Sequence, residues 1–190
     1  LTRRSSRVDT TVRKIITPST IYAIPGTSVM LTLPAEVSPL PPAVPSSTVG
    51  ATSLIVRDDD PEFFDRFDAT AIVATDVPAL SALTVRYWNG AAWVDVPAAV
   101  GIVGPTTLSV PLPAGVEGLE FEFTPLAFGS VLPPGFNVQA NVRTVLRSTL
   151  RGTTDPAIDP TGPAPVTVEN TVVSEVTNPV ASPSFATDSA

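Results

Sequence analysis

Residues 10–17 read Thr-Thr-Val-Arg-Lys-Ile-Ile-Thr, a largely β-branched run that contains the only lysine of the 190-residue chain. Alternate residues of a β-strand point to the same face, so Lys14 is expected to share a face with Val12 and Ile16. A lysine amine on an apolar face costs free energy unless it is paired or chemically consumed. The rest of the chain is therefore expected to supply a partner for this amine.

Outside this run the sequence is typical of short strands separated by turns. Apolar residues make up 43% of the chain, and its 22 prolines alternate with runs of Val, Ile, Leu and Thr. The exception is 62–67 (Glu-Phe-Phe-Asp-Arg-Phe), whose phenylalanines have helical spacing. The expected strands lie at 10–16, 21–24, 28–33, 51–57, 69–74, 83–88, 91–96, 107–112, 118–124, 136–146 and 166–176.

These elements predict an all-β fold, an Ig-like antiparallel β-sandwich with one short helical turn. One domain over 10–177 is the simplest division, because no internal repeat is visible. Residues 1–9 are polar and basic and are interpreted as a leader or the end of a preceding domain. Residues 178–190 are polar and are predicted to be a linker or tail. We expect the chain to be a piece of a longer protein.

Composition excludes several classes of function. The chain has no cysteine and no histidine, which excludes disulfides, thiolate metal sites and His-dependent nucleophiles. A net charge of −7 and a pI near 4.4 argue against a nucleic-acid partner. No apolar run approaches the length of a membrane span, so no membrane insertion by this segment is expected. We expect no turnover enzyme and no cofactor, with calcium as the one exception considered below.

Two polar residues have the strand phase needed to meet the lysine. Asn170 alternates with Val166, Val168 and Val172, and Asp58 alternates with Leu54 and Val56. First and last strands commonly lie side by side in sandwiches, so the three polar groups can converge.

Their convergence would permit a specific reaction. Burial favours the neutral amine of Lys14 and the protonated acid of Asp58. The acid can polarise the carboxamide of Asn170 while the amine attacks its carbon, so that ammonia leaves and an amide joins Lys14 to Asn170. The reaction occurs once and needs no cofactor.

Four short motifs occur along the chain: Val-Arg-Lys-Ile-Ile-Thr-Pro-Ser-Thr at 12–20, Pro-Gly-Thr-Ser-Val at 25–29, Leu-Ile-Val-Arg-Asp-Asp-Asp-Pro at 54–61 and Glu-Asn-Thr-Val-Val at 169–173. Together they resemble tandem Ig-like repeats of Gram-positive-type bacterial surface proteins. In isopeptide-forming members of this class, lysine, acid and asparagine at such positions form the cross-link. Residues 69–95 are not covered by these motifs.

The resemblance implies a structural module of a secreted or wall-anchored adhesin or stalk. Its implied location is extracellular, at the cell surface or in the cell wall. The implied partners are neighbouring domains of the same surface protein and an unknown host or surface ligand.

Several alternatives stay open. The acid could be another member of the run 58–60, or Glu120 or Glu122, although these two are expected to face water. Lys14 could instead extend its charge to solvent, and Asn170 could simply bind a neighbouring backbone. A calcium site would use Asp58, Asp59, Asp60 and Asp65.

A carbohydrate site would use aromatic residues of the hairpin around Asn89-Gly90. That dipeptide predicts a two-residue turn, which pairs Trp88 with Ala91 and Arg86 with Trp93. Hairpin geometry then sends Tyr87 to the core and stacks Arg86 on Trp93.

Overall fold

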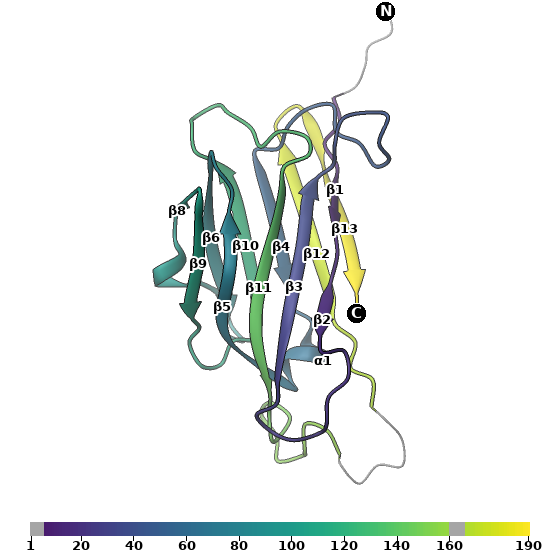
Figure 1. The fold of residues 1–190 in the computed structure, drawn as a ribbon, viewed down its shortest axis with the longest axis vertical. Coiled ribbons are helices and arrows are strands. Elements are labelled where there is room, and N and C mark those ends of the chain that lie inside the picture. Colours follow the sequence, from purple (N-terminus) through teal and green to yellow (C-terminus); the bar gives the residue numbers. More distant parts are fainter. Residues whose placement is uncertain (1–5, 160–165) are drawn as a thin grey trace, which may run out of the picture.

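The computed structural model, which describes residues 6–159 and 166–190, consists of two antiparallel β-sheets packed face to face (Figure 1). The predicted all-β antiparallel sandwich with one short helical turn is confirmed. The helical turn is α1 (Pro61–Phe64), and it begins at an Asp60 N-cap with proline in the first position. A 3₁₀ turn, η1, follows at Pro97–Ala99.

The first sheet has the strand order β1-β3-β11-β5-β9, with β2 also paired to β3. Its strands are β1 (Thr10–Val12), β2 (Ile15–Thr17), β3 (Ser28–Val37), β5 (Phe67–Val77), β9 (Thr106–Pro111) and β11 (Asn137–Leu146). The second sheet has the order β13-β12-β4-β10-β6-β7, with β8 paired to β6. Its strands are β4 (Ser53–Asp58), β6 (Ser81–Trp88), β7 (Trp93–Asp95), β8 (Ile102–Val103), β10 (Gly118–Pro125), β12 (Thr171–Asn178) and β13 (Ala181–Ser189).

The core lies between the sheets and follows from the period-two pattern of the long strands. In β3, every second residue from Val29 to Val37 is buried. In β10, Leu119, Phe121 and Phe123 point inward from the middle of the second sheet. Alternation of this kind gives each strand one apolar face, and the two sheets bury these faces against each other.

The first strand is interrupted where the lysine lies. Between β1 and β2 the chain departs from regular pairing at Arg13 and Lys14, although the amide of Arg13 still donates to the carbonyl of Pro34 at 2.8 Å. Both halves pair with β3, so the first strand belongs to the first sheet.

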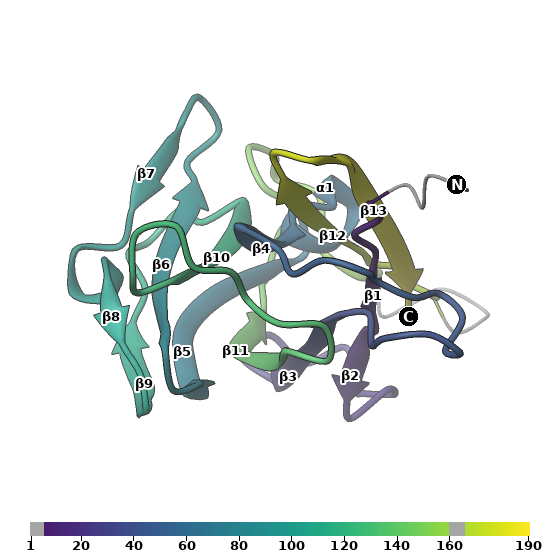
Figure 2. The same cartoon turned by 90° about the horizontal axis from the view of Figure 1, so that it is seen from above.

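The first and last strands meet across the sandwich and do not pair within one sheet. In Figure 2, β1 lies beside the hairpin of β12 and β13, which ends the second sheet. The hydroxyls of Thr10 and Ser174 lie 2.9 Å apart, and Ser184 Oγ donates to Asp9 at 3.0 Å. Side-chain hydrogen bonds therefore close the gap between the two sheet edges.

The predicted domain boundaries need correction at both ends. Residues 178–190, expected to be a linker or tail, include β13, which pairs along the length of β12. The last predicted strand begins at Thr171 instead of 166. Residues 1–5 of the expected leader lie outside the described residues, but Val8 is buried in the core.

The hairpin after β6 differs in register from the sequence expectation. Trp88 pairs with Trp93 and Arg86 pairs with Asp95, so the loop has four residues and not two. Asn89 Oδ1 accepts hydrogen bonds from the amides of Ala91 and Ala92, which stabilises the longer loop. The predicted Arg86–Trp93 contact is therefore wrong, and Arg57 lies over Trp93 instead, 5.4 Å from the ring centroid.

Glu120 is buried, contrary to the expectation that it faces water. It points to the outer face of the second sheet, where Arg57 and Arg86 on the two neighbouring strands bind its carboxylate. Glu122 also bonds to Arg86, at 2.8 Å, and is partly exposed. Two arginines thus cover Glu120 and compensate for its burial.

Phe121→Ala is expected to lower the free energy of unfolding by about 3–5 kcal/mol, because it opens a cavity at the centre of the sandwich. Phe128→Ala, at a fully exposed position, is the control and should change it by less than about 0.5 kcal/mol. Urea denaturation measures both values. Equal losses in the two variants would contradict the assigned core.

Candidate functional site

The structure brings Lys14, Asp58 and Asn170 together in the buried space between the sheets. Lys14 comes from the break between β1 and β2, Asp58 from the last position of β4, and Asn170 from the residue before β12. Each is at most 5% exposed. The strand phases in the sequence predicted these inward orientations.

One carboxylate oxygen contacts both nitrogens of the cluster. Asp58 Oδ2 lies 2.6 Å from Lys14 Nζ and 3.3 Å from Asn170 Nδ2. The attacking and leaving nitrogens of the proposed amide exchange would therefore share a single proton acceptor.

Burial shifts both ionisable groups toward their neutral forms. It lowers the pKa of the Lys14 amine from its ordinary 10.5, against the opposing effect of the nearby Asp58 charge. It also raises the pKa of the Asp58 carboxyl from 3.8, against the opposing effect of Lys14. Proton transfer from Nζ to Oδ2 consequently costs less free energy here than it would in water.

Two oxygens of the cluster have no hydrogen-bond partner, namely Asp58 Oδ1 and Asn170 Oδ1. An unsatisfied buried oxygen costs about 1–3 kcal/mol. The fold therefore holds the cluster in place at a cost in free energy.

Backbone and side-chain contacts from the C-terminal hairpin hold the cluster in place. The amide of Lys14 donates to Asp188 Oδ2 at 2.7 Å. Asn170 and Ala190 exchange two backbone hydrogen bonds of 3.0 Å. Sequence reasoning missed both residues because the segment that contains them was predicted to be a linker.

The turn after β4 encloses the cluster from another side. Asp60 Oδ1 accepts from the amide of Glu62 and thereby starts α1, while its Oδ2 accepts from the amide of Thr171 at 3.0 Å. Phe63 of α1 places its ring centroid 5.8 Å from Lys14 Nζ and stacks on Phe67. The helical turn therefore supplies an apolar wall, and its N-cap fixes the residue next to Asn170.

The other candidate acids lie elsewhere. Asp60 accepts hydrogen bonds from the amides of Glu62 and Thr171. Glu120 and Glu122 lie on the outer face of the second sheet and bind arginines there. Among the acids considered from the sequence, Asp58 is the one hydrogen-bonded to Lys14 and Asn170.

The residues proposed for calcium do not assemble into a site. Asp58 points inward to Lys14, Asp60 caps α1, and Asp65 follows that helix. Within residues 6–159 and 166–190, no group of three acidic side chains has a geometry that could hold a metal ion.

The aromatic residues proposed for carbohydrate are only partly available. The rings of Trp88 and Trp93 are tilted by 54° with centroids 5.7 Å apart, and the guanidinium of Arg57 covers Trp93. Tyr87 packs partly against the core.

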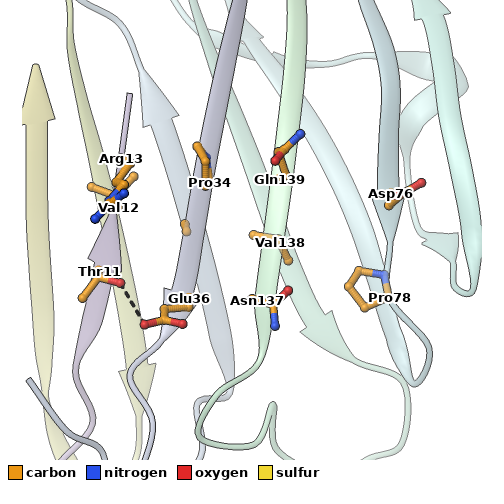
Figure 3. A pocket seen from close by; sticks show the side chains of 11 residues that line it. Thr11, Val12, Arg13, Pro34, Glu36, Asp76, Pro78, Asn137, Val138 and Gln139 are labelled. Carbon is orange, nitrogen blue, oxygen red and sulfur yellow. Dashed lines mark hydrogen bonds between the residues drawn. The ribbon is translucent and has the colours of Figure 1, made fainter. Parts of the chain in front are cut away.

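A shallow groove of about 800 Å³ runs over the first sheet, away from the buried cluster (Figure 3). Arg13 lines it, whereas the next residue, Lys14, is buried in the core. Polar side chains of β3, β5 and β11 also line it, including Glu36, Asp76 and Gln139. Sequence reasoning did not single out this groove.

No protein-family model and no curated protein sequence matches the chain. Among solved structures, the N-terminal domain of a Streptococcus gordonii adhesin aligns with 93% of this chain at 13% identity and a TM-score of 0.38. This chain spans 31% of that adhesin chain. A bacterial hydrophobin, BslA, aligns over 96% of this chain and 92% of its own at 10% identity, with a TM-score of 0.30.

The delta-toxin of Clostridium perfringens aligns over 92% of this chain and 80% of its own at 6% identity, with a TM-score of 0.34. Likenesses at this level carry no information about function. In the described part of the chain, no helix is long and apolar enough to cross a membrane.

The buried acid can be tested in a chain that cannot form an amide. Asn170→Ala removes the carboxamide, and Lys14→Met in that background removes the partner of Asp58. Burial then keeps the pKa of Asp58 above 3.8, so the folded state retains a proton that the unfolded state releases. The contribution of Asp58 to the free energy of unfolding should be highest below about pH 3.8 and should fall as pH rises through the raised pKa.

Urea denaturation from pH 3 to 8 measures this dependence. The control adds Asp58→Asn to the same two substitutions, and it should lack the fall and be about 3–5 kcal/mol more stable at neutral pH. Parallel pH profiles in the two variants would contradict an inward, desolvated Asp58.

Proposed function

We propose that the chain is a structural module of a bacterial surface adhesin or stalk, stabilised by an intramolecular amide between Lys14 and Asn170. The observation that carries the proposal is the contact of Asp58 Oδ2 with both Lys14 Nζ and Asn170 Nδ2 inside an apolar core. The assignment to a surface protein rests on the sequence resemblance, which also motivates an extracellular location.

The proposed reaction needs only the three side chains. The neutral amine of Lys14 attacks Cγ of Asn170 and forms the C–N bond. Asp58 takes the proton that Nζ loses and delivers it to Nδ2, so that the old C–N bond breaks and ammonia leaves. The products are one secondary amide, one ammonia and an unchanged Asp58.

The surroundings favour this reaction in three ways. Burial lowers the pKa of Lys14, which provides the neutral nucleophile. Burial raises the pKa of Asp58, which makes it a proton carrier. The hydrogen bond that Lys14 donates to Asp188 and the two that Asn170 exchanges with Ala190 hold the reacting residues in place, which reduces the entropy lost on reaching the transition state.

Intact mass spectrometry of the purified chain tests the amide directly. The measured mass should fall below the sequence mass by one ammonia. Lys14→Ala, Asn170→Ala and Asp58→Ala should each have their full calculated mass, because each removes a necessary group. Asp59→Asn, at the exposed neighbouring acid, is the matched control and should keep the deficit.

Asn170→Asp provides a further check of the chemistry, because an amide formed from a carboxylic acid releases water and not ammonia. A wild-type chain at its full sequence mass would overturn the proposal. A deficit that survives in Lys14→Ala would place the cross-link at other residues.

The cross-link should also raise thermal stability. It closes a loop of more than 150 residues, which by analogy with disulfides contributes about 4–5 kcal/mol. For a domain of this size that corresponds to a Tm about 10–20 °C above that of Asn170→Ala. Calorimetry measures both, and equal Tm values would contradict a stabilising role for the amide.

A further inference from the structure

One end of the sandwich, the upper end in Figure 1, is built from four loops that hydrogen bonds join into one unit. The loops are 38–50, 78–80, 126–136 and 179–180, and we call them together the apolar end. Ala51 and Leu132 exchange backbone hydrogen bonds of 2.7 and 2.8 Å, which join the first loop to the third.

The remaining two loops are attached to this pair. The amide of Leu126 donates to the carbonyl of Leu80 at 3.1 Å, and Asn178 Nδ2 donates to the carbonyl of Gly50 at 2.6 Å. The four loops are therefore linked to one another at this end of the sandwich, which Figure 2 shows from above.

Exposed apolar side chains concentrate on this surface. Fourteen large hydrophobic side chains are exposed in the described part of the chain, and seven of them lie in these 29 residues. The loops make up less than a sixth of the sequence but hold half of these exposed side chains. The seven are Leu40, Val44, Leu80, Leu126, Phe128, Val131 and Val180.

The same loops contain no charged residue, although the chain carries a net charge of −7. Close to the loops, Arg7 pairs with Asp9, and the carboxylates of Glu36 and Asp76 lie two residues before the first and second loops. At the opposite end, by contrast, Asp68 pairs with Arg147 and Arg151. The apolar end could therefore enter a nonpolar medium without desolvating a charge of its own loops.

Prolines and internal hydrogen bonds reduce the number of unpaired amides at the apolar end. Eight of the 22 prolines lie in the four loops, and proline has no amide hydrogen to leave unpaired. Several of the remaining amides are bonded within the loops, for example Ser47 to Pro39, Ser130 to Ala127 and Phe136 to Pro133. Each amide that is paired or absent is one polar group fewer to desolvate when the loops contact an apolar phase.

The shape of the apolar end favours a fluid surface over a folded protein as its partner. Val44 is 95% exposed and Phe128 is fully exposed, so both are at protruding tips and do not line a groove. A fluid apolar phase can surround separate tips, whereas a protein partner must present a matching hollow. A bilayer is a poorer fit, since its hydrocarbon lies beneath phosphates that basic residues usually bind, and the loops contain none.

From these observations we propose that the apolar end is an adsorption surface that docks the domain onto a bare hydrocarbon–water interface. The four loops enter the apolar side, and the charged opposite end stays in water. The proposal does not depend on the Lys14–Asn170 amide, because the cluster and the apolar end are separate parts of the molecule.

Partition onto hexadecane droplets in buffer tests the proposal with the whole chain. The triple variant Val44→Ser, Phe128→Ser, Val180→Ser removes three protruding apolar side chains and should bind droplets at least about tenfold more weakly than wild type. The matched control Tyr22→Ser, Ile24→Ser, Phe185→Ser removes three comparably exposed side chains from outside the apolar end and should retain wild-type partition. Circular dichroism establishes that both variants are folded.

Four outcomes would overturn the proposal. Wild-type partition in both variants, or an equal loss in both, would show that the apolar end does not direct adsorption. A wild-type dimer in light scattering that becomes monomeric in the first variant would assign the surface to a second copy of the chain. Binding to phosphatidylcholine vesicles as tight as to droplets would assign it to lipid bilayers.

Discussion

The burial of Lys14 against Asp58 is the constraint on which this structure depends. Neither side chain has access to water, and their contact of 2.6 Å is the main compensation for the loss of hydration. In such a place an ion pair and a neutral amine–acid pair lie closer in free energy than they do in solvent. The carboxamide of Asn170 lies within hydrogen-bond distance of the same oxygen and would be the substrate of the proposed amide exchange.

The cluster depends on contacts from the whole fold. Lys14 is held by Asp188 of the last strand, and Asn170 is held by the backbone of Ala190. Asp60 connects the end of β4 to the start of β12, next to Asn170. The site is therefore complete only when the first strand, the helical turn and the C-terminal hairpin are all in place. Chemistry at this site would follow folding and would not precede it.

Strand phase predicted the inward residues well, because side-chain alternation is a local property of a strand. It placed Lys14, Asp58 and Asn170 on apolar faces before their neighbours were known. Strand phase missed what depends on contacts with other residues. Glu120 is buried because two arginines on adjacent strands bind it. The side chain of Asn89 lengthens a turn that its dipeptide predicts to be tight. Strand β13 was missed because an edge strand with one exposed face needs few apolar residues.

The position of Asn170 in the chain has a mechanical consequence. Twenty residues follow it, and they form the β12–β13 hairpin. With Lys14 and Asn170 covalently joined, tension between residues 14 and 190 would reach the amide and bypass the 155 residues between the joined pair. The hairpin alone would peel from β4 and extend by up to about 70 Å, at 3.3–3.6 Å per residue. Under load the domain would then lengthen by a fixed amount and resist further extension once the hairpin is fully extended.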